Sequence, residues 1–321
     1  MNPRHSTRQP SGRRQSEEHA LKIGIAGTGR MGTAMAQRLL SLDHDVTVWN
    51  RTADKTKPLV AAGAKAASTP AALAASADLI LSILTNADAI ESAYHGEDGL
   101  LANDVRGRLF VEMSTVRPQV ERELAENVRA KGAALIDSPV GGTVGPAQNG
   151  RLLAFVGGDV ADVARARPVL EQLCRRVEHV GPVGAGASLK LAINLPLLVY
   201  WQALGEALAL CRPLTIDPAR LMDIIADTSG GANVLKGRGA AIAEALKGKE
   251  IATPTFDVDS IRKDLSTMVE EAQSLGYASP VAQRVLDCFD AASRAGMGAM
   301  DGAMLPVRWA EHGIQNPEDR G

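Results

Sequence analysis

Two polar residues, Lys190 and Asn194, stand four positions apart in an otherwise apolar stretch that follows the glycine-rich segment 181–186. This spacing places both side chains on one face of a helix. A lysine with apolar neighbours has a lowered pKa, so it can donate a proton to a carbonyl oxygen or accept one from an alcohol. Asn194 could orient the lysine or bind a substrate hydroxyl. The pair therefore indicates proton-transfer catalysis at a helix start, although a lone lysine of this kind is more often a solvated surface residue.

A second glycine-rich segment, GTGRMG at 27–32, fits the pattern G-x-G-x-x-G. It follows an apolar run typical of a strand and opens a helix-like stretch, which is the context in which this pattern binds a dinucleotide. The first glycine would allow the tight turn, the second would let the backbone approach a pyrophosphate, and the third would let helix and strand pack closely. Backbone N–H groups at the helix start would then hold the phosphates. The predicted cofactor loop consists of Gly27, Thr28, Gly29, Arg30, Met31 and Gly32.

The residues that end the next predicted strand bear on the choice between NAD and NADP. NAD-binding sites usually place Asp or Glu there, where the carboxylate accepts a hydrogen bond from the ribose 2′-hydroxyl. This chain has Asn50, Arg51 and Thr52 instead. Arg51 could pair with a 2′-phosphate through its planar guanidinium, and Asn50 and Thr52 could add hydrogen bonds. We therefore predict NADP as the preferred cofactor and NAD as the second choice. The alternative is that Arg51 only stacks on adenine or stays solvated.

Short apolar runs alternate with helix-like stretches over the first half of the chain. Two such stretches occupy about 30–42 and 117–131. This alternation predicts an α/β fold with a mainly parallel, doubly wound Rossmann sheet. The strand-like runs lie at 21–27, 45–50, 78–84, 108–113, 133–137 and 151–156.

Beyond residue 186 the strand pattern stops and only helix-like blocks follow. Asp217 and Pro218 form a typical helix start. The first block contains Lys190 and predicts a long helix that joins the sheet to an all-helical domain. The blocks lie near 187–212, 216–228, 236–247, 259–276 and 279–295. We divide the chain into a disordered tail (1–20), an NADP-binding Rossmann domain (21–184), an all-helical domain for substrate binding and oligomerisation (185–312) and a second tail (313–321).

The composition excludes several classes of protein. With 45% hydrophobic residues among 321, the chain can bury a core large enough for two domains. A net charge of −2 gives no electrostatic footprint for nucleic acid or an anionic membrane, and 3% aromatic residues leave little for base stacking. The three cysteines, Cys174, Cys211 and Cys288, are far apart. We therefore predict no disulfide framework, no metal site and a reducing, cytoplasmic location.

Two segments resemble targeting or membrane elements but do not meet the requirements. Residues 1–20 lack the apolar segment of a signal peptide, and Glu17 and Glu18 argue against a transit peptide. The uncharged stretch 191–205 is shorter than the roughly 20 residues that a membrane-spanning helix needs. We expect it to be a buried helix of the core, and we expect no membrane partner.

Six motifs occur in order along the chain: GTGRMGTAMAQRL (27–39), NRT (50–52), MST (113–115), DSPVGGT (137–143), G-x-x-G-x-G-x-x-x-K-x-x-x-N (181–194) and KDL (263–265). Together they resemble the β-hydroxyacid dehydrogenase family. That family includes 3-hydroxyisobutyrate dehydrogenases, tartronate semialdehyde reductases and glyoxylate/succinic semialdehyde reductases, and it is related to 6-phosphogluconate dehydrogenase. The resemblance covers about 21–310, and the ordered set is far more specific than any single motif.

The resemblance implies an oxidoreductase that moves a hydride between nicotinamide C4 and the carbonyl carbon of a small β-hydroxyacid or short aldehyde-acid. Lys190 would be the catalytic lysine, and Asn194 its helper. The family is usually dimeric or tetrameric, which implies a homodimer or homotetramer. By their positions in the motifs, the cofactor-binding residues would also include Leu84, Thr85, Thr115 and Lys263, and the substrate-binding residues would be Ser114, Gly141, Gly142, Thr143 and Asn233.

Some of these assignments have simpler alternatives. Lys263 could form a surface ion pair with Asp264 beside it, and Asn233 could belong to a helix–helix turn. The family usually reads D-x-P-V-S-G-G, whereas this chain has Gly141 at the serine position and a hydroxyl two residues later, on Thr143. Backbone amides of this turn could still bind a small anionic substrate. Gly142 lacks the arginine of sulfolactaldehyde reductases, so a sulfonate is not indicated.

Two other functions remain for this sequence. One is an imine reductase, an enzyme related in fold that often lacks the lysine. The other is a regulatory protein that binds NADP without catalysis. The presence of both Lys190 and Asn194 makes each of them less favoured than the dehydrogenase.

Overall fold

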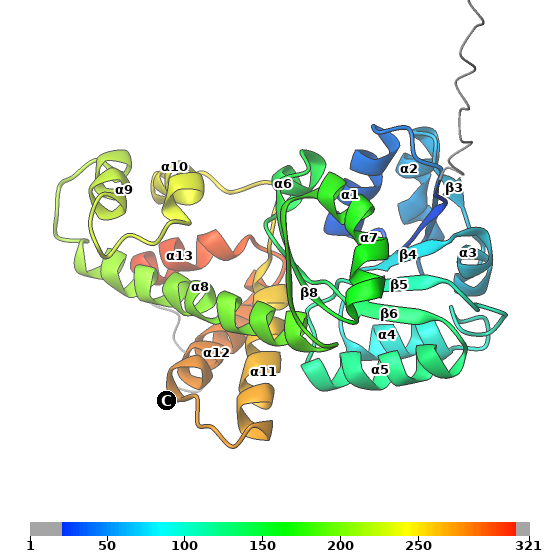
Figure 1. The fold of residues 1–321 in the computed structure, drawn as a ribbon. Coiled ribbons are helices and arrows are strands. Elements are labelled where there is room, and N and C mark those ends of the chain that lie inside the picture. The colour runs from blue at the N-terminus through cyan, green and yellow to red at the C-terminus, as the bar shows by residue number, and fades with distance from the viewer. Residues whose placement is uncertain (1–20, 313–321) are drawn as a thin grey trace, which may run out of the picture.

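The computed structural model describes residues 21–312, which form an N-terminal sheet domain and a C-terminal helical domain (Figure 1). The predicted tails, 1–20 and 313–321, lie outside the described residues.

The sheet of the N-terminal domain follows the order β3-β2-β1-β4-β5-β6-β8-β7, with β9 added beside β8. The strands from β3 to β6 are parallel, whereas β8 runs antiparallel to β6 and β7. The chain reverses strand order at β1, so the carboxyl ends of β1 and β4 flank a switch point where α/β proteins bind ligands. The strands are β1 (Ile23–Ala26), β2 (Val46–Trp49), β3 (Lys65–Ala66), β4 (Leu79–Ser82), β5 (Leu109–Glu112), β6 (Ala134–Asp137), β7 (Val140–Gly141), β8 (Leu152–Gly157) and β9 (Cys174–Gly181).

Helices cover both faces of the sheet, which confirms the predicted doubly wound fold (Figure 1). Helices α1 and α7 share one hydrophobic core with the sheet, and α3, α4 and α5 share a second on the other side. Strands β1, β4 and β5 are buried along their whole length, as expected for strands covered on both faces. The helices are α1 (Arg30–Leu40), η1 (Ala53–Thr56), α2 (Lys57–Ala61), α3 (Pro70–Ser76), α4 (Ala87–His95), α5 (Pro118–Ala130), α6 (Val144–Gln148) and α7 (Val160–Leu173).

The C-terminal domain is helical and is built around the long helix α8, as predicted. Helices α11, α12 and α13 pack on α8 (Figure 1), and Trp201 of α8 is buried in their common core. The predicted cap of α9 is present, because Asp217 Oδ1 accepts from Ala219 N at 2.9 Å and Arg220 N at 3.2 Å. The elements are α8 (Ala185–Leu210), α9 (Pro218–Ala226), α10 (Leu235–Leu246), α11 (Val258–Ser274), α12 (Pro280–Ala292), η2 (Ser293–Met297), η3 (Gly302–Met304) and α13 (Leu305–His312).

Parts of the fold were not predicted from the sequence. β3 is a pair of exposed residues, and β9 is an edge strand rich in charged, exposed side chains, so neither has the apolar run that predicts a strand. Helix α8 continues through Pro196, although a proline inside a helix has no N–H to donate to the carbonyl four residues before it. Among the described residues, α8 is also the one helix long and apolar enough to cross a membrane, but it is the central helix of this domain's core.

Candidate active site

The glycines of the cofactor loop are fixed by close contacts between β1, α1 and β4. Gly27 has φ +98°, and a Cβ there would lie 2.3 Å from the carbonyl oxygen of Ile83. A Cβ on Gly32 would lie 2.0 Å from the carbonyl oxygen of Gly27. In contrast, a Cβ on Gly29, the N-cap of α1, would meet no atom within 4 Å. Two of the three glycines therefore shape the turn, and the middle one leaves open space where a phosphate would lie.

Substitution of Gly32 should disturb this turn. We expect Gly32→Ala to lower the free energy of unfolding by about 1–3 kcal/mol, as for other overpacked sites, and to weaken cofactor binding by displacing the carbonyl of Gly27. Urea unfolding with and without NADP measures both effects. Gly237→Ala, where the added methyl meets no atom within 4 Å, is the control and should bind cofactor normally. Equal stability and affinity of Gly32→Ala and the wild type would contradict this account.

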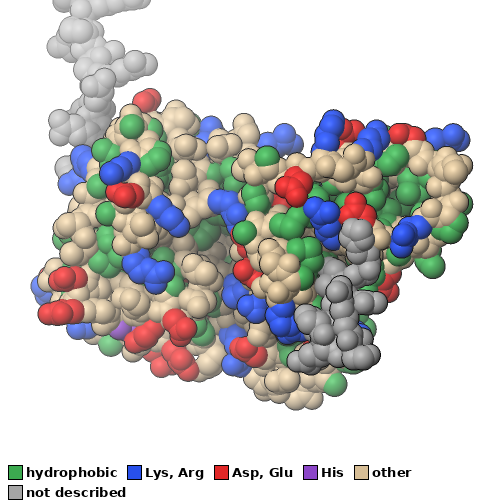
Figure 2. Space-filling view, turned by 180° about the vertical axis from the view of Figure 1, so that it is seen from behind, with side chains coloured by type: hydrophobic (Ala, Val, Ile, Leu, Met, Phe, Trp, Pro, Cys, Tyr) green, Lys and Arg blue, Asp and Glu red, His purple; other side chains and the backbone are tan. Residues whose placement is uncertain are grey.

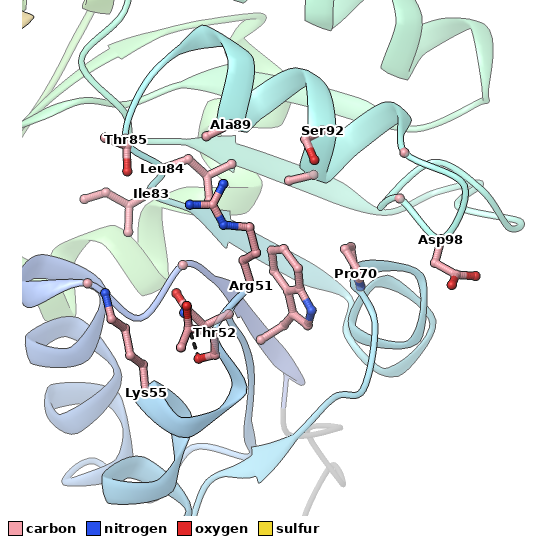
Figure 3. Close-up of a pocket in the computed structure, with 17 residues that line it drawn as sticks. Arg51, Thr52, Lys55, Pro70, Ile83, Leu84, Thr85, Ala89, Ser92 and Asp98 are labelled. Carbon is pink, nitrogen blue, oxygen red and sulfur yellow. Dashed lines mark hydrogen bonds between the residues drawn. The ribbon is translucent and has the colours of Figure 1, made fainter.

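A cleft of about 340 Å³ opens beside this loop at the carboxyl ends of the strands (Figure 3). It brings together seven of the residues predicted to bind the cofactor: Gly27, Gly29, Asn50, Arg51, Thr52, Leu84 and Thr85. In Figure 3, Arg51 extends across the cleft toward Leu84 and Thr85, which come from the other wall. The sequence motifs at 27–32, 50–52 and 84–85 thus converge on one elongated site.

Asn50 shapes the cleft and has little freedom to bind a ligand. Its Oδ1 accepts from Thr28 N at 3.1 Å, and its Nδ2 donates to Thr52 O at 3.0 Å. The side-chain amide therefore joins the ends of β1 and β2 rather than reaching for a phosphate. The Oγ1 atom of Thr28 is buried without a hydrogen-bond partner, so it can accept or donate toward a bound group.

Two cations at the rim of the cleft are available to an anion. The side chains of Arg51 and Lys55 line the cleft, are exposed, and form no hydrogen bond or ion pair with any part of the chain that the structure describes. The sequence did not single out Lys55, because it lies in a short, mostly polar and charged run (54–57) that is typical of a solvated surface. The turn of η1 after β2 places it in the same cleft as Arg51.

Lys190 lies in the second turn of α8, facing the sheet domain. Its Nζ donates to Val140 O at 2.8 Å, and the residue is only 9% exposed. Burial lowers the pKa of Lys190 from 10.5 to about 8; Asp264 opposes this shift, and Lys263 adds to it. A lysine with that pKa exchanges its proton near neutral pH, as a general acid or base requires. Asn194, one turn further along, is also 9% exposed and its side chain bonds to none of the described residues.

Helix α11 closes the site from the side of the helical domain. Lys263 Nζ donates to Thr115 O at 2.7 Å and lies 2.5 Å from Asp264 Oδ1. The ion pair predicted as an alternative does exist, but Asp264 is 4% exposed and acts on Lys190, so it is not a surface pair. Lys263 and Thr115 thus meet at the carboxyl end of β5, close enough to Lys190 for Lys263 to affect its pKa.

The turn that follows Val140 presents free donors next to the lysine. Gly142 has φ +123°, and the backbone N–H groups of Gly142 and Thr143 donate to no group in the described part of the chain. Both residues are exposed, whereas Gly141 is half-buried and pairs with Leu153 of β8. Since the carbonyl before this turn holds the Lys190 ammonium, an anion bound at the turn would lie close to a positive charge.

Asp137 is a site residue whose function the sequence did not reveal. It is fully buried, with Oδ1 accepting from Gly184 N at 2.7 Å and Oδ2 from Ala187 N at 2.8 Å. It thereby binds the first turn of α8 and sets the position of Lys190. Burial raises the pKa of Asp137 to about 6, although the hydrogen bonds from the helix start lower it. The one indication of its importance in the sequence was its position at the start of the motif 137–143, just before the turn at 141–143.

Removal of this carboxylate should loosen α8. We expect Asp137→Ala to lower the free energy of unfolding by about 1–3 kcal/mol for each of the two buried N–H groups left without a partner, and to lower activity because Lys190 loses its fixed position. Urea unfolding and a turnover assay measure these effects. Asp217→Ala removes an exposed helix cap for comparison and should lower the free energy of unfolding by less than Asp137→Ala does. An unchanged unfolding midpoint for Asp137→Ala would refute the anchoring function.

Ser114 and Asn233 are placed differently from the substrate contacts that we expected. Ser114 is 1% exposed, and its Oγ accepts from Leu84 N at 2.7 Å while its N donates to Glu112 Oε1 at 2.8 Å. It therefore ties the loops after β4 and β5 together. Asn233 is exposed in the turn between α9 and α10, toward the C-terminal end of α8, whereas Lys190 is near its start (Figure 1). Within one chain, Asn233 therefore belongs to the helix–helix turn.

Two members of the predicted cofactor loop face away from the cleft. Met31 is half-buried and packs on the core of the sheet domain. The guanidinium of Arg30 pairs with Asp257 of the helical domain and donates to Pro254 O at 3.3 Å. Neither residue lines the cleft. The described residues contain no group of three or more His, Cys, Asp or Glu side chains that could hold a metal ion.

Comparisons with known proteins show which proteins this chain is similar to. A family model for the NAD-binding domain of 6-phosphogluconate dehydrogenase matches residues 22–181, and a model for the NAD-binding of NADP-dependent 3-hydroxyisobutyrate dehydrogenase matches residues 184–308. The 3-hydroxyisobutyrate dehydrogenase of Pseudomonas aeruginosa is 35% identical over 262 residues, which cover 81% of this chain and 88% of that protein. Glyoxylate/succinic semialdehyde reductase 1 of Arabidopsis thaliana is 29% identical, covering 88% and 96%. The solved structure of Psf3 in complex with NADP+ and 2-OPP has a TM-score of 0.80 at 26% identity, covering 89% and 99%.

Proposed function

The chain belongs to the β-hydroxyacid dehydrogenase family, and from that premise we propose that it interconverts a small hydroxyacid and the corresponding aldehyde- or keto-acid, with NADP(H) as the preferred cofactor. It is an NAD(P)-dependent oxidoreductase that acts on CH–OH groups. The observation that carries the proposal is the buried ammonium of Lys190, which lies beside unpaired backbone donors at one end of the site, with the dinucleotide loop at the other.

The residues present fit a dinucleotide. Open space at Gly29, the unpartnered hydroxyl of Thr28 and the convergence of three loops on one cleft all suit a pyrophosphate and ribose. Arg51 and Lys55 support a preference for NADP, because both are free cations in the same cleft and the position directly after β2 is Asn50 rather than a carboxylate that would repel a 2′-phosphate. Lys and Arg side chains lie around the hollow between the two domains, and Asp and Glu side chains also lie beside it (Figure 2).

When bound, NADP(H) supplies or accepts a hydride at nicotinamide C4. In the reductive direction, the protonated Nζ of Lys190 donates a proton to the substrate oxygen as the carbonyl carbon becomes tetrahedral. In the oxidative direction, neutral Lys190 accepts the hydroxyl proton. The carbonyl of Val140 accepts a hydrogen bond from this lysine and orients it. The carboxylate of Asp264 raises its pKa and so favours the protonated form. Asn194 is free to bind the substrate hydroxyl.

A carboxylate is the anion that suits the other end of the substrate. The backbone donors of Gly142 and Thr143 and the nearby ammonium of Lys263 would bind it. Gly141 stands where the family usually has a serine, so the hydroxyl of this turn comes from Thr143 instead. The substrate we propose is therefore small and carries one anionic group within reach of both the turn and Lys190.

The exposed surface of α8 supports a proposal that the protein is a homodimer or homotetramer. Less than half (44%) of the apolar stretch of 18 residues in α8 is buried within the single chain. On the exposed part, Ile193 and Leu210 are 43% and 83% exposed. Apolar surface of this kind is typical of contacts between subunits. We also propose a cytoplasmic location, which its three free cysteines support.

The experiment that tests the function is a screen of short hydroxyacids, semialdehydes and sulfonate analogues with NADPH, NADP+, NADH and NAD+, followed at 340 nm. We expect turnover with a carboxylate-bearing substrate and a higher kcat/KM with the phosphorylated cofactor. Binding of cofactor with no turnover of any member of the panel would instead favour a regulatory protein.

A further inference from the structure

Arg30 is placed where a phosphate-binding residue would be, yet its side chain serves another contact. It is the first residue of α1, directly after the open position at Gly29. Its guanidinium does not line the cofactor cleft; it forms an ion pair with Asp257 and donates to Pro254 O at 3.3 Å. The pair joins residues 227 positions apart and links the cofactor loop to the helical domain.

The partner of Arg30 is held firmly by the helical domain. Asp257 is the N-cap of α11, and its Oδ1 accepts from Ser260 N at 2.8 Å, which leaves Oδ2 for Arg30. The segment around it is fixed to Asp301, because Thr255 N donates to Asp301 Oδ2 at 2.8 Å. Asp301 in turn pairs with Arg238 of α10. A movement of Arg30 therefore acts on the helical domain as a whole, and not on a loose loop.

Asp257 also stands at the start of the helix that completes the catalytic site. Lys263 and Asp264 follow in the second turn of α11. Lys263 binds Thr115 O, and Asp264 raises the pKa of Lys190 against the effect of burial. Helix α11 is thus fastened to the sheet domain at three places: at the cofactor loop through Asp257, at the end of β5 through Lys263, and at the start of α5 through Glu271, which pairs with Arg117 at 3.0 Å.

We propose that Arg30 and Asp257 are positioning residues, whose ion pair sets α11 against the cofactor loop and so aligns Lys263 and Asp264 with Lys190 around a bound dinucleotide. This inference rests on the proposed function. The pair is partly exposed, with side-chain exposures of 41% and 18%, so it contributes little to overall stability. Its effect falls on the alignment of the two halves of the site and on retention of the cofactor between them.

The test is a double-mutant cycle with Arg30→Gln, Asp257→Asn and the double variant. Asparagine caps helices about as well as aspartate, so Asp257→Asn keeps the start of α11 and removes only the charge. We measure NADPH dissociation by stopped-flow fluorescence. Each single variant should release NADPH about 1.5- to fivefold faster, as for the loss of one partly exposed ion pair. The double variant should be no worse than the more affected single variant.

Two further readouts separate positioning from a simple structural contribution. In Asp257→Asn, the pKa of Lys190 that appears in the pH profile of catalysis should fall, because a displaced Asp264 raises it less. The thermal midpoint of unfolding should stay unchanged. The charge-swapped variant Arg30→Asp/Asp257→Arg should recover part of the lost NADPH retention. Asp159→Asn, which removes the exposed Arg129–Asp159 pair within the sheet domain, is the control and should match the wild type.

The inference would be overturned if Asp257→Asn bound NADPH more tightly, because Arg30 would then be a phosphate ligand that Asp257 withholds. Additive effects of the two substitutions, or no change in dissociation, would also overturn it. Its failure is distinguishable from that of the proposed function. A wild type that bound NADPH but turned over no member of the panel would refute the proposed function. The double-mutant cycle on NADPH dissociation would still show whether the Arg30–Asp257 pair helps to retain the cofactor.

Discussion

Replacing Lys190 with alanine is expected to lower kcat by about 10²–10⁴-fold, the range for loss of a positioned general acid or base. NADPH affinity should stay nearly unchanged, because Lys190 bonds the carbonyl of Val140 and does not line the dinucleotide cleft. The loss should appear in kcat and kcat/KM together, as for an interaction made in the transition state. Steady-state kinetics with the best substrate of the panel, together with NADPH titration, measure both quantities.

The control for this variant is Lys65→Ala, which removes an exposed lysine that pairs with Asp45 and does not line the cleft. It should keep normal turnover. The NADPH affinity of Lys190→Ala is also informative. A large loss of NADPH binding would indicate that the start of α8 is misfolded in this variant. Near-normal turnover in Lys190→Ala would exclude the proton-transfer function.

Reversing the charge at Arg51 is expected to reverse the choice of cofactor. Arg51→Glu should lower kcat/KM with NADPH by about 10–100-fold, the value of a charge-assisted hydrogen bond, and should leave kcat/KM with NADH unchanged or raised. The new carboxylate would repel the 2′-phosphate and could accept a hydrogen bond from a 2′-hydroxyl. Paired kinetics with the two reduced cofactors give the ratio directly.

Lys55 gives an independent check on this cofactor assignment. Lys55→Ala should weaken NADPH more than NADH, by a smaller factor than Arg51→Glu, because it removes one cation and adds no repulsion. Lys57→Ala is the matched control, since Lys57 pairs with Asp54 and does not line the cleft. Equal kcat/KM for the two cofactors in the wild type, or an unchanged ratio in Arg51→Glu, would show that Arg51 does not read the phosphate.

The sequence predicted those parts of the site that lie in one short segment. The glycine loop follows a buried strand and opens a helix, so its contacts are local, and Lys190 and Asn194 share a helix face by spacing alone. The doubly wound sheet also follows from local alternation. Its edge did not, because β9 is exposed and charged and thus lacks the apolar signal of a strand.

The parts that were missed depend on contacts between distant segments. Asp137 caps α8 across 47 and 50 residues, and Arg30 reaches Asp257 across 227. No periodicity or spacing reveals such pairs, because they arise only when the domains pack. Ser114 was expected to face the substrate, but the fold uses its hydroxyl to fix the loop at Leu84. A hydroxyl beside a site in the sequence can thus support the site without touching the substrate.

The pH dependence of hydride transfer tests the central claim most directly. Because burial lowers the pKa of Lys190 to about 8, its protonated form, which reduction needs, is lost as pH rises through that value. The single-turnover rate of aldehyde-acid reduction should therefore fall above about pH 8, and the rate of hydroxyacid oxidation should rise through the same pKa. Lys190→Arg, which keeps its charge over this range, should remove that limb. A wild-type rate that is constant from about pH 7 to 9.5, or the same limb in Lys190→Arg, would contradict catalysis by Lys190.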